Sequence, residues 1–132
     1  MILAYLDASA LVKLVLPEAE SDAIHKEIRQ WPARATSVIG AIELRRTVRK
    51  AGFDDGYVRR ADDALRMTAS IAITGEIIDG AVRDVPTTLR SLDAIHLASA
   101  LSLGSDLGAF IAYDGRLLDA ARELGLPVLS PA

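Results

Sequence analysis

Residues 1–17, MILAYLDASALVKLVLP, carry a clear signal of the fold. Its first six residues form a short apolar run that stops at an acid, Asp7, and such a run is typical of a buried strand that ends in a turn. The following apolar residues recur at helical spacing until Pro17, and a proline ends a helix. The stretch therefore predicts a strand, a turn and a helix, with an acid at the junction.

The same alternation continues to the end of the chain. Further strands are expected at residues 33–37, 69–74, 109–113 and 128–129. Further helices are expected at residues 18–30, 38–51, from 54 or 55 to 67, 76–85, from 92 to 104, and before Gly125. Five strands interleaved with helices predict an α/β fold, in which a parallel five-stranded sheet is sandwiched between helices.

Length and composition limit the classes of protein that remain. A chain of 132 residues with 51% hydrophobic residues is expected to form one domain, residues 1–132, around one core. It has no cysteine, which fits a reducing compartment and favours a cytoplasmic protein. No apolar run approaches the roughly 20 residues of a membrane span, and no basic segment precedes the first apolar run as in a signal peptide. The net charge of −3 excludes a protein that binds nucleic acid by being basic over its whole surface.

Four acids stand where a parallel sheet places its functional site. Asp7 and Asp114 follow expected strands, Asp93 begins a helix after a loop, and Glu43 lies six residues into the helix after the second strand. In open parallel sheets the site lies outside the carboxyl ends of the strands. The four carboxylates are therefore expected to converge.

A purely structural alternative stays open for three of these acids. An Asp between a strand and a helix is most often an N-cap, and Asp7, Asp93 and Asp114 all have that position. Glu43 differs because it lies in the apolar segment SVIGAIEL, where a core-facing helix would ordinarily carry another apolar residue. A half-buried Glu at this position requires a partner.

Converging carboxylates point to a hard cation. Four of them repel one another, and their pKa values rise unless cations neutralise them. Oxygen ligands without Cys or clustered His select Mg²⁺ or Mn²⁺ over zinc or copper. Such ions orient a water, lower its pKa and stabilise the attacking and leaving oxygens of a phosphodiester. Hydrolysis of nucleic acid is the chemistry that this pattern predicts.

Each acid also lies in a distinctive segment: LDASALVKL around Asp7, SVIGAIEL around Glu43, LDAIHLASAL around Asp93 and FIAYDGRLLDAARELGLPV around Asp114. In these segments and in the order of its acids, the chain resembles the VapC-type toxins, which are PIN-domain ribonucleases. The resemblance runs from the first strand to the last. It implies a single PIN domain at residues 1–132 with a PIN-like fold.

The resemblance assigns roles to the acids. It implies that Asp7, Glu43, Asp93 and Asp114 form an acidic quartet around Mg²⁺ or Mn²⁺. Asp7 and Asp93 would be the direct or water-bridged ligands, and the other two would complete the pocket. Ser9 matches the small hydroxyl residue of the family, and it either hydrogen-bonds within the site or caps the first helix.

The resemblance also implies an activity and partners. The activity would be a metal-dependent endoribonuclease toxin that cleaves RNA through an activated water and is blocked by a cognate VapB-type antitoxin. The antitoxin's C-terminal segment would bind in grooves between the early helices, and homodimers would form through the helices after Glu43. One departure is Ala112, which stands where family members commonly carry Thr or Ser. A hydroxyl beside Asp114 is therefore missing.

A basic stretch and a histidine near the acids each have a possible structural or functional role. Between Glu43 and Arg60 there are six basic residues and three acids. This stretch is either a solvated helix pair or a contact with the RNA backbone, and the second interpretation assigns RNA binding to Arg45 and Arg46. His96, three residues after Asp93, is expected to have a packing role, because a hard cation has little use for imidazole.

Two other functions are alternatives to the ribonuclease. A receiver-like signalling domain would need paired acids after the first strand and a Lys after a late strand, whereas Ala8 and Ser9 follow Asp7 and the chain ends Ser130-Pro131-Ala132. A catalytically inactive PIN-like binding module is the other alternative. The intact quartet argues against it, and Ala112 keeps it open.

Overall fold

The computed structural model describes all residues, 1–132. Strands and helices alternate along the chain, apart from pairs of successive helices. In order, the elements are β1 (Leu3–Leu6), α1 (Ala8–Val15), α2 (Ser21–Ile28), β2 (Ala33–Ser37), α3 (Val38–Ala51), α4 (Asp55–Arg66), β3 (Ala69–Ile71), α5 (Gly75–Arg83), α6 (Ser91–Leu101), a 3₁₀ turn (Gly104–Asp106), β4 (Leu107–Ile111), α7 (Gly115–Glu123) and β5 (Val128–Leu129).

The five strands form one sheet in the order β3-β2-β1-β4-β5, and all neighbours pair in parallel. This confirms the predicted parallel α/β sheet. From β1 the chain first adds strands on one side, β2 and β3, and then on the other, β4 and β5. The direction of winding thus reverses between β1 and β4, and the crevice at such a reversal is where open sheets bind ligands.

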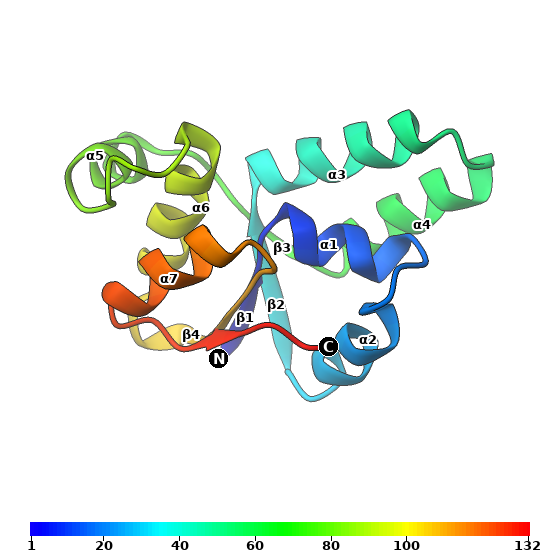
Figure 1. Cartoon of the computed structure of the whole chain (residues 1–132), viewed down its shortest axis with the longest axis horizontal. Helices are drawn as coiled ribbons and strands as arrows, with labels where there is room; N and C mark the ends of the chain where they lie inside the picture. The colour runs from blue at the N-terminus through cyan, green and yellow to red at the C-terminus, as the bar shows by residue number, and fades with distance from the viewer.

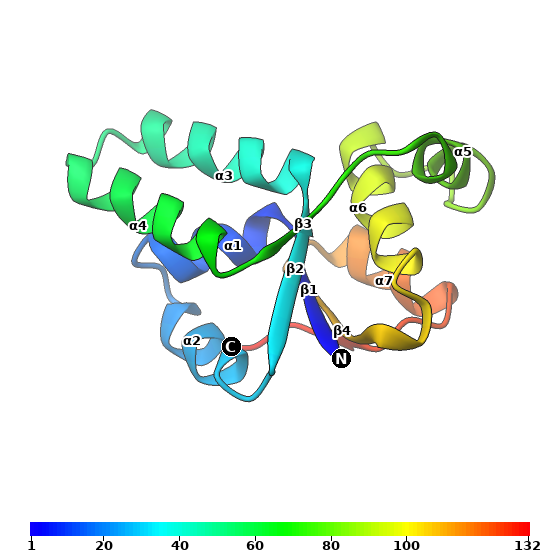
Figure 2. The ribbon, with the colours of Figure 1, turned by 180° about the vertical axis from the view of Figure 1, so that it is seen from behind.

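The helices cover both faces of the sheet. Figures 1 and 2 show α1 to α4 on one face and α5 to α7 on the other. The alternation of side chains along β1 explains the two cores: Ala4 and Leu6 join the cluster with Leu11 and Leu44, whereas Tyr5 joins the cluster with Phe110. None of the helices has the length and apolarity needed to cross a lipid bilayer.

Several predicted boundaries are wrong by a few residues. The helix expected at 92–104 ends at Leu101, before a 3₁₀ turn. The helix expected at 18–30 begins at Ser21, whose hydroxyl accepts the Glu18 amide outside the helix. The strand expected at 69–74 ends at Ile71, because Thr74 instead caps α5 through the amide of Ile77. The strand expected at 109–113 spans Leu107–Ile111.

Local caps mark the ends of the two long helices on the first face. The side chain of Asp54 accepts the Gly56 amide at the start of α4. α3 ends at Gly52, which has a left-handed φ of 72°, a conformation that favours glycine. Ser37, the last residue of β2, caps α3 by accepting the Ile39 amide, so the first turn of α3 lies at the carboxyl edge of the sheet (Figure 1).

Candidate active site

Two of the four predicted acids act as helix caps. Asp7 follows β1 directly, and its Oδ1 accepts the Ala10 amide at 3.0 Å at the start of α1. Asp114 starts α7 in the same way, and its Oδ1 accepts the amides of Arg116 at 2.8 Å and Leu117 at 3.2 Å. The cap role is therefore confirmed for both, and each cap also fixes a carboxylate at the carboxyl edge of the sheet.

Asp93 has no such role. It is the third residue of α6, whose N-cap position is held by Arg90 without a side-chain cap. No hydrogen bond or ion pair within the protein engages the Asp93 carboxylate. The structural alternative is thus wrong for Asp93, and a half-buried carboxylate without a protein partner requires another explanation.

Electrostatic interactions link Asp93 to the other three acids. Burial raises the pKa of Asp93 above its ordinary value, and repulsion from Asp114 and Glu43 raises it further. Burial likewise raises the pKa of Asp7, which is 4% exposed, and repulsion from Asp93 acts in the same direction. Hydrogen bonds from Ser9 and the Ala10 amide partly offset this rise. Asp93 is therefore near enough to interact electrostatically with the other three acids.

Glu43 has the partner that its apolar surroundings require. Its Oε1 lies 2.8 Å from Nε2 of His96, a side chain that is 1% exposed. The other ring nitrogen of His96, Nδ1, lies 2.7 Å from the buried hydroxyl of Tyr5. The packing role predicted for His96 was thus incomplete. The signal in the sequence was the unexplained Glu itself, because a buried acid is stable only when it is paired.

Ser9 hydrogen-bonds within the site. Its hydroxyl donates to Asp7 Oδ1 at 2.7 Å and accepts the Tyr113 amide at 3.2 Å. The alternative that Ser9 caps the helix is wrong, because Asp7 is the cap. Ala112 is fully buried. The missing hydroxyl at that position leaves Asp114 anchored, since two backbone amides hold its carboxylate.

The acids share one pattern of bonding. Asp7, Glu43 and Asp114 each bond the protein through one carboxylate oxygen and leave the second without a protein partner. The only fully buried side-chain oxygen or nitrogen without a hydrogen bond is Ser99 Oγ. The second oxygen of Asp7 therefore reaches solvent even though the residue is largely buried. Oxygens held in this way have free lone pairs for a ligand.

This donor set fits a hard divalent cation. No three Asp, Glu, His or Cys side chains lie close enough to form a complete metal cage. The four acids therefore do not form a preassembled site with three protein ligands in this structure. Mg²⁺ is ordinarily held by one or two carboxylates together with waters and substrate phosphates. Two hydrogen bonds orient the Asp7 carboxylate, whereas the Asp93 carboxylate has none.

The predicted RNA contacts lie in different directions. Nε of Arg45 is 3.2 Å from Asp62 on α4, and two residues along a helix turn a side chain by about 200°, which directs Arg45 away from Glu43. Arg46 is three residues along, within about 60° of the Glu43 direction. Arg90 was not predicted, yet its positive charge lowers the pKa of Asp93, so it lies near the site.

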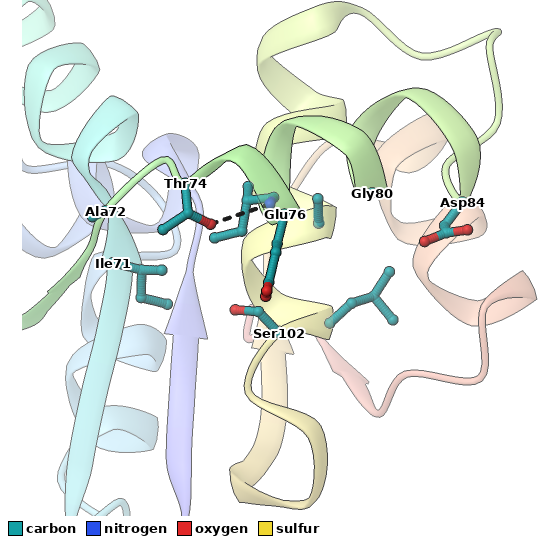
Figure 3. A pocket seen from close by; sticks show the side chains of 10 residues that line it. Ile71, Ala72, Thr74, Glu76, Gly80, Asp84 and Ser102 are labelled. Carbon is teal, nitrogen blue, oxygen red and sulfur yellow. Dashed lines mark hydrogen bonds between the residues drawn. The ribbon is translucent and has the colours of Figure 1, made fainter.

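A separate groove lies between α5, α6 and the end of β3 (Figure 3). Its volume is about 490 Å³, and its acids are Glu76 and Asp84. In Figure 3 the side chain of Glu76 points toward Ser102 across the groove. None of the four predicted acids lines it, so this groove is distinct from the candidate active site.

Comparison with known sequences identifies relatives along nearly the whole chain. The family model described as PIN domain matches residues 4–123. The chain is 38% identical over 128 residues to the ribonuclease VapC46 of Mycobacterium tuberculosis, with 97% of each chain covered. It is 40% identical over 135 residues to the ribonuclease VapC47 of the same species, with 96% of each covered.

Solved structures share the fold at lower identity. VapC20 of Mycobacterium tuberculosis, described as a toxin that cleaves the sarcin-ricin loop, superposes with a TM-score of 0.76 at 18% identity and covers 97% of this chain and 99% of its own. VapBC2 of Rickettsia felis, solved with a fragment of promoter DNA, superposes with a TM-score of 0.77 at 12% identity. The match covers 99% of this chain and 100% of the Rickettsia chain. A toxin–antitoxin complex of Klebsiella pneumoniae gives 0.73 at 22% identity, with coverage of 98% of both chains.

Proposed function

The chain belongs to the PIN-domain family, and on this premise we propose that it is an endoribonuclease toxin that hydrolyses RNA phosphodiester bonds with a divalent cation. The observation that carries the proposal is Asp93, a half-buried carboxylate without a protein partner that is repelled by the surrounding acids. Such an arrangement is costly for the fold, and a cation would relieve it. Membership of this family excludes the alternative of a receiver-like signalling domain.

Asp7 and Asp93 are the residues proposed to hold the cation, which we take to be Mg²⁺ or Mn²⁺. When bound, the cation supplies charge stabilisation to the phosphodiester oxygens and makes water more acidic. Ser9 and the Ala10 amide keep Asp7 oriented through Oδ1, and its second oxygen has no protein partner and is free for a ligand. Asp114 and Glu43 are proposed to complete the pocket, each held from the protein side.

Positive side chains beside the acids are proposed to hold the RNA backbone. Phosphate contacts position a nucleic acid without reading its sequence. Arg46 and Arg90 have the favourable locations, one on α3 near Glu43 and one at the start of α6 near Asp93. Arg45, which pairs with Asp62 on the α4 side, would act on RNA that extends beyond the pocket.

The proposed partners follow from the relatives. Structures of the same fold include toxin–antitoxin complexes, and we propose that a VapB-type antitoxin blocks this chain. A groove at the α1, α2 and α4 side, lined by residues that include Leu14, Pro17 and Arg60, is the proposed seat of its C-terminal segment. We further propose a cytoplasmic homodimer, formed through helices after Glu43, in which residues 1–132 make a single domain.

The inactive-module alternative lacks support. It depended on Ala112, yet two backbone amides hold Asp114 without help from a hydroxyl. No acid of the quartet is lost, and each keeps an oxygen without a protein partner. The ribonuclease therefore remains the single proposal.

The decisive experiment uses the purified chain freed of any co-purifying partner. It is incubated with total cellular RNA and Mg²⁺ or Mn²⁺, and the RNA ends produced are mapped. The controls are EDTA and the Asp93→Asn variant, and binding of Mn²⁺ is measured separately by calorimetry. Discrete cuts that disappear in both controls are expected. Absence of cuts with every metal and RNA source, in a chain that remains folded, would contradict the proposal.

A further inference from the structure

We infer that Tyr5 and His96 form a buried positioning relay that fixes the carboxylate of Glu43 at the edge of the active site; this deepens the proposed function and rests on it. The relay crosses three elements, because Tyr5 belongs to β1, His96 to α6 and Glu43 to α3. Neither Tyr5 nor His96 is one of the four acids, and His96 contacts the site through Glu43. They act through Glu43 and are positioning residues.

With His96 neutral, the hydrogen-bond chemistry gives the relay one direction. An ionised carboxylate only accepts, so the 2.8 Å contact to Glu43 Oε1 requires a proton on Nε2 of His96. In a neutral imidazole the other nitrogen, Nδ1, then accepts, and the Tyr5 hydroxyl at 2.7 Å is its donor. Tyr5 is fully buried, and burial raises its pKa, which keeps the proton on this hydroxyl. One tautomer of His96 satisfies both bonds.

Packing prevents either ring from turning. Tyr5 stacks on Phe110 with centroids 5.5 Å apart and planes 5° apart. Gly40, one turn before Glu43 on α3, has no side chain where α3 approaches His96. A Cβ there would lie 3.2 Å from His96 Cε1 and would overlap Thr36 Oγ1. The residue that lets α3 come close to the imidazole and the residue that bonds it are thus on the same helix face.

The relay counters a specific force. Glu43 and Asp93 repel each other, and a Glu side chain is long enough to swing away from such repulsion into solvent. The bond to His96 holds Oε1 and leaves Oε2 without a protein partner. Groups that orient a metal-site carboxylate from behind change metal affinity or activity by about 10- to 100-fold when they are removed. The same range is expected here.

The test compares variants that delete the bonds with one that keeps the donor. His96→Leu removes both bonds, Tyr5→Phe removes only the hydroxyl, and His96→Gln retains an N–H donor near the Nε2 position. Thr68→Val is the matched control, because it removes a buried hydroxyl and its bond to the Ala64 carbonyl in α4, outside the relay. For each folded variant, Mn²⁺ affinity is measured by calorimetry, and kcat and KM for RNA cleavage are measured separately.

We expect His96→Leu to weaken Mn²⁺ binding or kcat by about 10- to 100-fold, with KM little changed. Tyr5→Phe should show a smaller loss in the same parameter, His96→Gln should recover most of it, and Thr68→Val should match the wild type. If His96→Leu does not fold, Tyr5→Phe and His96→Gln decide the question. Wild-type metal affinity and kcat in all relay variants would overturn the inference.

A spectroscopic arm separates the relay from the proposed function. The chain has two histidines, His25 and His96, and His25 is exposed, so it serves as an internal reference. Nitrogen-15 NMR of the imidazoles should show His96 fixed with the proton on Nε2, and Tyr5→Phe should lose that fixed tautomer. A wild-type chain that gives this signature but neither binds Mn²⁺ nor cleaves RNA would overturn the function alone. Averaged tautomers in His96 of an active wild type would overturn the relay alone.

Discussion

The hydroxyl of Ser9 lies 3.2 Å from the amide nitrogen of Tyr113, a residue 104 positions away in the chain. The contact joins the turn after β1 to the turn after β4, the two strands between which the winding of the sheet reverses. The same hydroxyl donates to Asp7 Oδ1. Ser9 therefore holds together the two turns that carry Asp7 and Asp114.

Ser9→Ala should lower cleavage by about 10- to 100-fold, since Asp7 loses an orienting bond at a metal site. It should also lower the free energy of unfolding by about 1 kcal/mol, because the Tyr113 amide loses its acceptor. Ser9→Thr keeps the hydroxyl and is the matched control. Cleavage kinetics and urea unfolding measure the two effects. Equal cleavage by Ser9→Ala and wild type would contradict the assigned role.

Asp7→Asn and Asp93→Asn should each abolish cleavage without unfolding the chain. Asn caps a helix about as well as Asp, so the start of α1 is retained. Asp93 makes no bond within the protein, and its removal relieves repulsion among the acids. Circular dichroism should give melting temperatures at or above that of the wild type, and a variant that still cleaves RNA would exclude that acid from the site.

Stability in EDTA should depend on pH through Asp93. Burial and repulsion raise its pKa above 3.8, so between 3.8 and the raised value the folded chain binds more protons than the unfolded chain. The free energy of unfolding contributed by this group therefore falls as pH rises through that window and recovers as pH falls. At neutral pH, urea unfolding should give Asp93→Asn a higher free energy of unfolding than the wild type. This difference should shrink as the pH is lowered. A constant margin would refute the electrostatic account.

Gly40→Ala should destabilise the chain by about 1–3 kcal/mol, the usual effect of overpacking. The new Cβ would overlap Thr36 Oγ1, which is held by the Leu6 carbonyl, and would press on His96. Gly75→Ala is the matched control, because nothing lies within 4 Å of a Cβ at that position in the first turn of α5. Urea unfolding should show the two substitutions moving stability in opposite directions or by clearly different amounts.

Arg46→Gln should weaken RNA binding more than Arg45→Gln does. Arg46 lies toward Glu43 on α3, whereas Arg45 is paired with Asp62. Each lost phosphate contact on a single strand reduces the slope of log affinity against log salt by about 0.7. Filter binding to an uncleaved RNA in the Asp93→Asn background, at several salt concentrations, measures the slope. Identical slopes for wild type and Arg46→Gln would remove this residue from the RNA contact.

Much of the fold was predictable because its signals are local. β2 at Ala33–Ser37 and α3 at Val38–Ala51 match the expected ranges. The strand before Asp114 was less predictable. It ends at Ile111, and the Tyr113 amide turns out of the sheet to Ser9, a partner too distant in sequence to be recognised from the pattern.

Local sequence patterns specify the parallel α/β class and the positions of Asp7, Asp93 and Asp114 near helix starts, because periodicity and capping depend on neighbouring residues. The tertiary structure alone decided which acid is free and which are held. It brought His96 to Glu43 across 53 residues, turned Arg45 toward α4 and left Asp93 without a partner. These relationships depend on strand register and on the close approach of α3 to α6, which no local pattern encodes.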